Sequence, residues 1–157
     1  MIELLTQTIP FHIKTQVLVL LELIFKRYPK ALKGAENNIG DCLQKLKMED
    51  KIIPLIFNVY NSMVNVLNEK TLENIINQTF NKINDVTLSI KQLDPIFTFM
   101  NLAGGKVNAK SIKQILNNCK NDFNNLSESK SKMAAILAGI SKEDSKLIEY
   151  CVKVISS

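Results

Sequence analysis

The sequence predicts an all-α fold, a single-domain bundle of about seven to eight helices. Apolar residues recur at steps of three and four along most of the chain, and short polar or Gly/Pro breaks separate these segments. Only five Gly and four Pro occur in 157 residues, too few for the many tight turns of a β-sandwich or barrel. With 46% hydrophobic residues, the chain is long enough to bury a continuous core. We therefore expect one domain over residues 1–157, with a weak internal boundary near 103–107.

The first predicted helix is the most hydrophobic. It begins near Pro10, a favourable first-turn residue, and ends at Tyr28. Apolar residues cover more than half of its circumference, so we expect it to be buried on most sides, near the centre of the bundle. A more polar helix follows at roughly 35–47. A third covers about 51–68, with Pro54 in its first turn.

The second half of the chain predicts further helices of ordinary length. Thr71 is the expected N-cap of the fourth helix. Asp94-Pro95 should end that helix. A short apolar piece over 96–103 then meets Gly104-Gly105, where we expect a left-handed C-cap. Three more helices complete the chain.

The spacing of the helices suggests a repeat. Helices near 10, 51 and 96 start some 41–45 residues apart, and the first two open with an apolar-Pro-apolar sequence. Two-helix solenoid units recur at about this period. Beyond the prolines, no shared residue signature stands out. The spacing therefore suggests stacked antiparallel (HEAT-like) hairpins as one form of the bundle, and a closed bundle is the alternative.

The stretch from Gly104 to Ser111 is one residue away from a phosphate-binding loop. Ala109 stands where that loop requires its second Gly, and its methyl group would obstruct the approach of phosphates to the backbone. No series of strands surrounds it. We therefore predict a turn, with Asn108 as the N-cap of the next helix.

Lysines crowd the start of that helix, where cations oppose the macrodipole unless an anion joins them. This predicts a candidate site for an anion or an acidic partner, formed by Lys106, Lys110, Ser111, Lys113 and Lys120.

The charge distribution points to the same region. The net charge is +5, with Arg27 as the single arginine. Residues 1–103 hold 11 basic and 10 acidic side chains, whereas 104–157 hold 9 and 5. Any anionic partner should therefore bind the C-terminal third. Nucleic acid is the alternative partner, and its binding would weaken steeply with salt.

Residues used in catalysis or metal binding are scarce. His12 is the only histidine, without a second ligand at helical spacing. Cys42, Cys119 and Cys151 lie far apart on apolar faces, which is typical of buried thiols in a reducing compartment. The longest apolar stretch falls short of the ~20 residues that a membrane span needs. We predict a cytoplasmic protein with no membrane span, cofactor, metal or small-molecule substrate.

These observations favour a non-catalytic interaction module: an adaptor, an assembly subunit or a small effector. Its partner would be another protein or a second copy of this chain, bound by a helix face. The alternative is a basic helical subunit that binds nucleic acid through the lysines named above. The third helix offers more apolar area than one core face uses, although burial in the core is the other interpretation. The candidate protein-binding strip is Ile53, Ile56, Phe57 and Tyr60.

Overall fold

The computed structural model describes residues 8–47, 49–82, 88–119, 128–141 and 145–156. Within these residues there are eight helices and no strand, which confirms the predicted all-α class. The helices are α2 (Phe11–Arg27), α3 (Glu36–Gln44), α4 (Ile53–Met63), α5 (Glu69–Lys82), α6 (Ile90–Gly104), α7 (Ala109–Cys119), α8 (Glu128–Ser141) and α9 (Ser145–Ser156).

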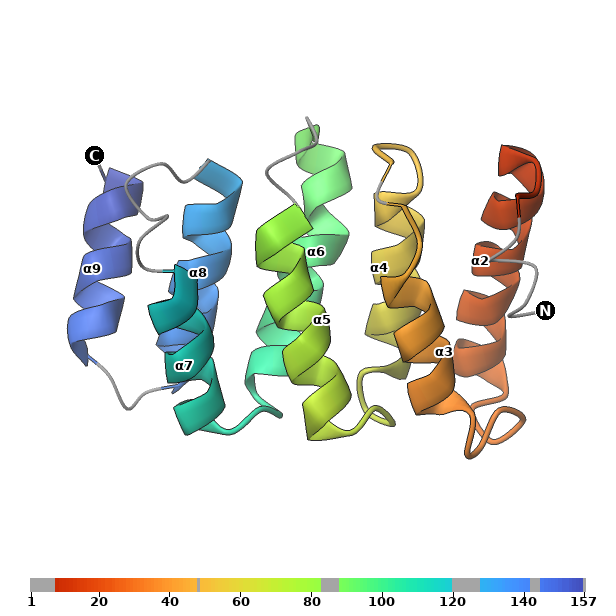
Figure 1. Cartoon of the computed structure of the whole chain (residues 1–157), viewed down its shortest axis with the longest axis horizontal. Helices are drawn as coiled ribbons and strands as arrows, with labels where there is room; N and C mark the ends of the chain where they lie inside the picture. Colours follow the sequence, from red (N-terminus) through yellow and green to blue (C-terminus); the bar gives the residue numbers. More distant parts are fainter. Residues whose placement is uncertain (1–7, 48, 83–87, 120–127, 142–144, 157) are drawn as a thin grey trace.

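The helices stand upright in two layers (Figure 1). Helices α2, α4, α6 and α8 pack in succession to form one layer, and α9 continues the row beyond α8. Helices α3, α5 and α7 form the second layer in front of it. Helices that follow one another in the chain run in opposite directions, so the described helices form a stack of antiparallel hairpins, which is one of the two alternatives left open by the sequence.

The core fills the space between the layers and between neighbouring helices of the first layer. It is continuous from Val17 on α2 to Ala138 on α8. At its centre, Phe57 and Tyr60 of α4 meet Phe99 of α6, with ring centroids 5.4–5.6 Å apart. Such aromatic pairs stabilise beyond the area they bury. This cluster therefore joins the two middle helices of the row.

One polar atom in this cluster is unsatisfied. The hydroxyl of Tyr60 is buried and lacks a hydrogen-bond partner among the described residues. Burial, with a smaller contribution from the charge of Asp41, raises the pKa of the phenol above its usual value. Since a buried unpaired hydroxyl costs free energy, we expect Tyr60→Phe to stabilise the protein by about 1 kcal/mol in urea unfolding. Destabilisation of that size would instead reveal a partner for the hydroxyl.

The start of α5 differs from the prediction by a few residues. Asn68 is the N-cap, because its Oδ1 accepts the backbone N–H of Thr71 at 2.8 Å. Thr71 itself is buried within the first turn. Asn and Thr both cap helices well, and Asn68, the earlier of the two in the chain, takes the N-cap position. At α7 the predicted cap is confirmed, since Oδ1 of Asn108 accepts the N–H of Lys110 at 2.8 Å.

The start of α6 corrects another prediction. Ser89 and Gln92 form a capping box, so the helix begins at Ile90. Pro95 consequently lies inside α6 instead of ending the preceding helix. The helix continues past it because buried Ile96, Phe99 and Met100 hold its next turns in the core.

In the glycine pair at the end of α6, Gly104 has a packing role. The predicted left-handed C-cap is wrong, because Gly105 has a φ of −70°. Gly104 is buried, and a Cβ added there would lie 3.0 Å from Cδ1 of Ile140. Gly104 therefore allows α6 to approach α8 closely. Among the described glycines, Gly34 is the one with a positive φ, 90°.

Candidate functional site

The predicted protein-binding strip on α4 lies in the core. Ile53, Ile56, Phe57 and Tyr60 are each at most 2% exposed. Helix α4 has α2 on one side, α6 on the other and α3 in front, so these neighbours cover its apolar faces. Burial was the interpretation left open for these residues, and it is the correct one. They cannot contact a partner from this position.

An exposed apolar face lies instead on α2. Val19, Leu20 and Leu23 are 42%, 48% and 42% exposed. Together with Thr15 and Gln16 they line a shallow, largely apolar hollow of about 260 Å³. The spacing of these residues places them on one face of the helix. We call this surface the outer face of α2.

The position of α2 corrects the prediction that it is central. Among the described helices it is at the end of its layer, with α4 as its neighbour in the row (Figure 1). Its buried residues are Val17, Leu18, Leu21 and Phe25, whereas Phe11, Val19, Leu20 and Leu23 are exposed. The sequence correctly indicated that the apolar surface of this helix is wider than one core face. This surface marked an uncovered helix face, which the sequence alone did not distinguish from burial on all sides.

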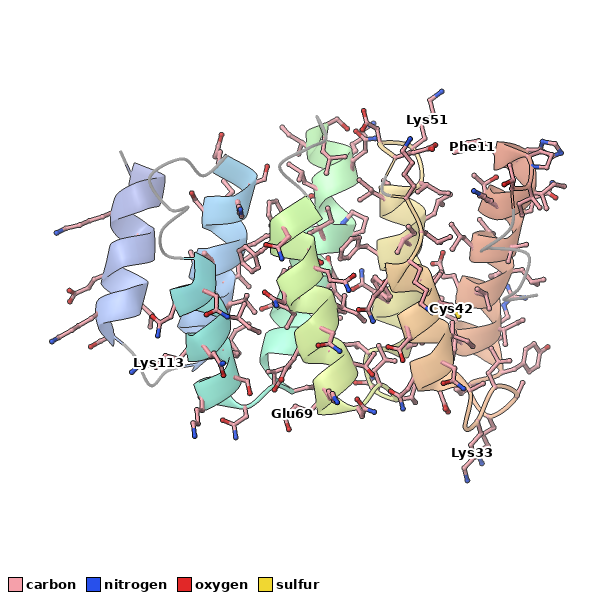
Figure 2. The ribbon with its side chains drawn as sticks, viewed as in Figure 1. Phe11, Lys33, Cys42, Lys51, Glu69 and Lys113 are labelled. Atoms are coloured by element: carbon pink, nitrogen blue, oxygen red, sulfur yellow. The ribbon has the colours of Figure 1, made fainter. Side chains whose placement is uncertain are left out.

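The predicted lysine cluster is present in part. Lys106, Lys110 and Lys113 are exposed around the start of α7. Lys120 lies outside the described residues. However, a carboxylate of the chain already occupies this helix start, because Oε1 of Glu69 accepts the N–H of Asn108 at 2.7 Å. The anion that the lysines and the helix dipole favour is therefore supplied by α5 (Figure 2).

Ser111 lies in a separate groove between α5 and α7. It is half-buried, and the groove contains a carboxylate, Glu73, with several amide side chains. The lining residues are Glu73, Asn74, Asn77, Ser111, Gln114, Ile115 and Asn118. A carboxylate in the groove disfavours an anionic ligand, so the structure does not join Ser111 to the lysines in one anion site.

The remaining residues considered for chemistry are scattered. His12 is exposed on α2, and Cys42 is a half-buried free thiol on α3. Within the described part of the chain, no three His, Cys, Asp or Glu side chains are grouped as metal ligands. Over the same residues, no helix has both the length and the apolar character to cross a bilayer.

Comparison with known proteins adds no relative: no family model, curated protein or solved structure matches the chain.

Proposed function

We propose that this chain is a non-catalytic interaction module, an adaptor or assembly subunit of the cytoplasm, which binds a helix of another protein on the outer face of α2. The observation that supports this most strongly is the exposure of Val19, Leu20 and Leu23 at the end of the helix row. Stacked helical proteins normally present a polar outer face on their end units. An apolar end face is therefore a surface that favours a partner.

The row of helices indicates what kind of partner fits. Helices α2, α4, α6 and α8 pack successively through apolar faces. A further helix laid against the outer face of α2 would extend this row by the same kind of contact. Helix recognition of this type uses apolar anchors at three- and four-residue spacing, which Val19, Leu20 and Leu23 provide. The free thiol at Cys42 fits a reducing compartment.

Affinity purification from cells that produce the protein tests this proposal. The wild type is compared with Val19→Ser/Leu20→Ser/Leu23→Ser, which keeps the charge and removes the apolar strip. Loss of three interface side chains costs about 3 kcal/mol or more, so we expect retention of the partner to fall by about 100-fold. Because all three are exposed, stability in urea should change by less than about 1.5 kcal/mol.

The control variant removes exposed apolar side chains elsewhere, with Ile90→Ser on α6 and Val152→Ser on α9. This variant should retain the partner as the wild type does. Retention of the same partner by the α2 variant would contradict the proposal, as would equal loss in the control. A partner that proves to be a second copy of the chain would show that the outer face of α2 joins two copies.

A further inference from the structure

Three turns of the stack lie along one edge of the molecule. They join α2 to α3, α4 to α5 and α6 to α7, and hydrogen bonds link them in series. The N–H of Asn68 donates to Oδ1 of Asn37 at 3.0 Å, and the N–H of Asn108 donates to Oε1 of Glu69 at 2.7 Å. This edge is at the bottom of Figure 1. We call residues 27–37, 64–70 and 102–110 the turn edge.

The turn edge is strongly basic. Its six cationic side chains are all exposed: Arg27, Lys30, Lys33, Lys70, Lys106 and Lys110. Its two carboxylates, Glu36 and Glu69, each accept a backbone N–H at 2.7 Å, from Gly34 and Asn108. The edge therefore carries an excess of four positive charges, nearly the whole net charge of +5. Lys33 extends outward from it in Figure 2.

At the opposite edge, the described connection from α3 to α4 is nearly balanced, because over 45–47 and 49–52 three lysines accompany Glu49 and Asp50. The turn edge is therefore more basic than this connection. This asymmetry also provides lysines for a control variant of equal charge.

Each turn of the basic edge also exposes one large apolar side chain. These are Tyr28 at 66%, Val66 at 41% and Leu102 at 40% exposed. Lysines with interspersed apolar and tyrosine side chains match the chemistry of a membrane interface, where aromatic rings sit at the headgroup level. An anionic leaflet attracts each nearby Lys or Arg by about 1 kcal/mol.

We propose that the turn edge binds the surface of an anionic membrane, with the helices standing upright on it and none crossing it. The observations favour a lipid surface over single-stranded nucleic acid. Nucleic acid requires aromatic side chains on which successive bases stack, and this edge offers Tyr28 alone. The edge also has one arginine, Arg27, although arginine is the residue that recognises nucleic-acid phosphates through paired hydrogen bonds. Lysine acts as a point charge, which is enough to attract a diffuse anionic lipid surface. The outer face of α2 is not part of this surface.

Co-sedimentation with vesicles tests the proposal. The probes are vesicles of phosphatidylcholine alone and of phosphatidylcholine with phosphatidylserine. We expect binding to the second kind only, decreasing as salt rises. Lys33→Gln/Lys70→Gln/Lys106→Gln removes one cation from each turn and should weaken the partition constant by about 100-fold. Tyr28→Ser/Val66→Ser should weaken it further without changing the charge.

The control variant is Lys47→Gln/Lys51→Gln/Lys91→Gln, which removes the same charge away from the turn edge. We expect its partition constant to stay within about threefold of the wild-type value. Circular dichroism confirms that each variant is folded. Equal loss in both triple variants, or no binding to anionic vesicles, would overturn the proposal. Binding to a single-stranded oligonucleotide without binding to vesicles would overturn it in favour of a nucleic-acid surface.

Discussion

Replacing Phe99 with Ala should reduce the free energy of unfolding by about 3–5 kcal/mol. The side chain of Phe99 is fully buried, and its ring contacts Phe57 and Tyr60 with centroids 5.6 and 5.5 Å away. Truncation removes apolar burial, leaves a cavity and breaks both ring contacts between α4 and α6. Small domains are stable by only about 5–15 kcal/mol, so this one change would leave the protein marginally folded.

Urea unfolding followed by circular dichroism measures this loss, and Phe99→Leu is the matched control. Leu keeps an apolar side chain of similar reach, so we expect it to cost about 1–1.5 kcal/mol. A loss below about 1 kcal/mol for Phe99→Ala would show that the aromatic cluster does not hold α4 and α6 together.

Replacing Pro95 with Ala should have the opposite effect and stabilise the protein by about 1–3 kcal/mol. Pro95 is the sixth residue of α6, so the helix lacks one interior N–H donor at this position. The proline ring also clashes sterically with the backbone carbonyl four residues earlier. The hydrogen bond from Nδ2 of Asn61 to the carbonyl of Pro95, 3.0 Å long, uses the backbone and survives the change. The melting temperature and the urea midpoint should both rise.

Pro54→Ala is the control for this prediction. Pro54 lies in the first turn of α4, where a helix N–H has no partner in any case. We expect this change to be neutral or slightly destabilising. If Pro54→Ala and Pro95→Ala changed the stability alike, the difference between first-turn and interior proline would not apply here.

The class of fold and most helices could be predicted from the sequence because the apolar periodicity is strong in each segment. The prolines that suggested a repeat were a weaker guide. Pro10 is the N-cap residue of α2, Pro54 lies in the first turn of α4 and Pro95 inside α6. They occupy three different helix positions, so their spacing indicated a repeat without locating its boundaries.

A better repeat signal was present at the second helix of each hairpin. Leu67-Asn-Glu-Lys-Thr-Leu72 opens α5, and Val107-Asn-Ala-Lys-Ser-Ile112 opens α7 forty residues later. The Asn of each caps its helix, the Lys is exposed on the turn edge, and the outer apolar residues are buried. Aligning these two segments would have predicted both helix starts and the exposed lysine that follows each of them.

The exposed face of α2, on which the proposed function rests, could not be predicted in the same way. Apolar residues on α2 and on α4 give the same periodic signal, because periodicity reports an apolar face and not what covers it. Coverage depends on the place of a helix in the row, which is a property of the whole stack. Helix α4 has neighbours on both sides, whereas α2 is at the end of its row.

The most direct test of the central claim is site-specific photo-crosslinking from position 20 of α2, in cells that produce the protein. The cross-linked residues of the partner should lie within one segment, and further probes at positions 19 and 23 should reach residues spaced by three or four along it. A probe at the exposed Asn81 of α5 should give no such product. Cross-links that match those from Asn81, or none at all from position 20, would contradict the claim that the outer face of α2 holds a partner helix.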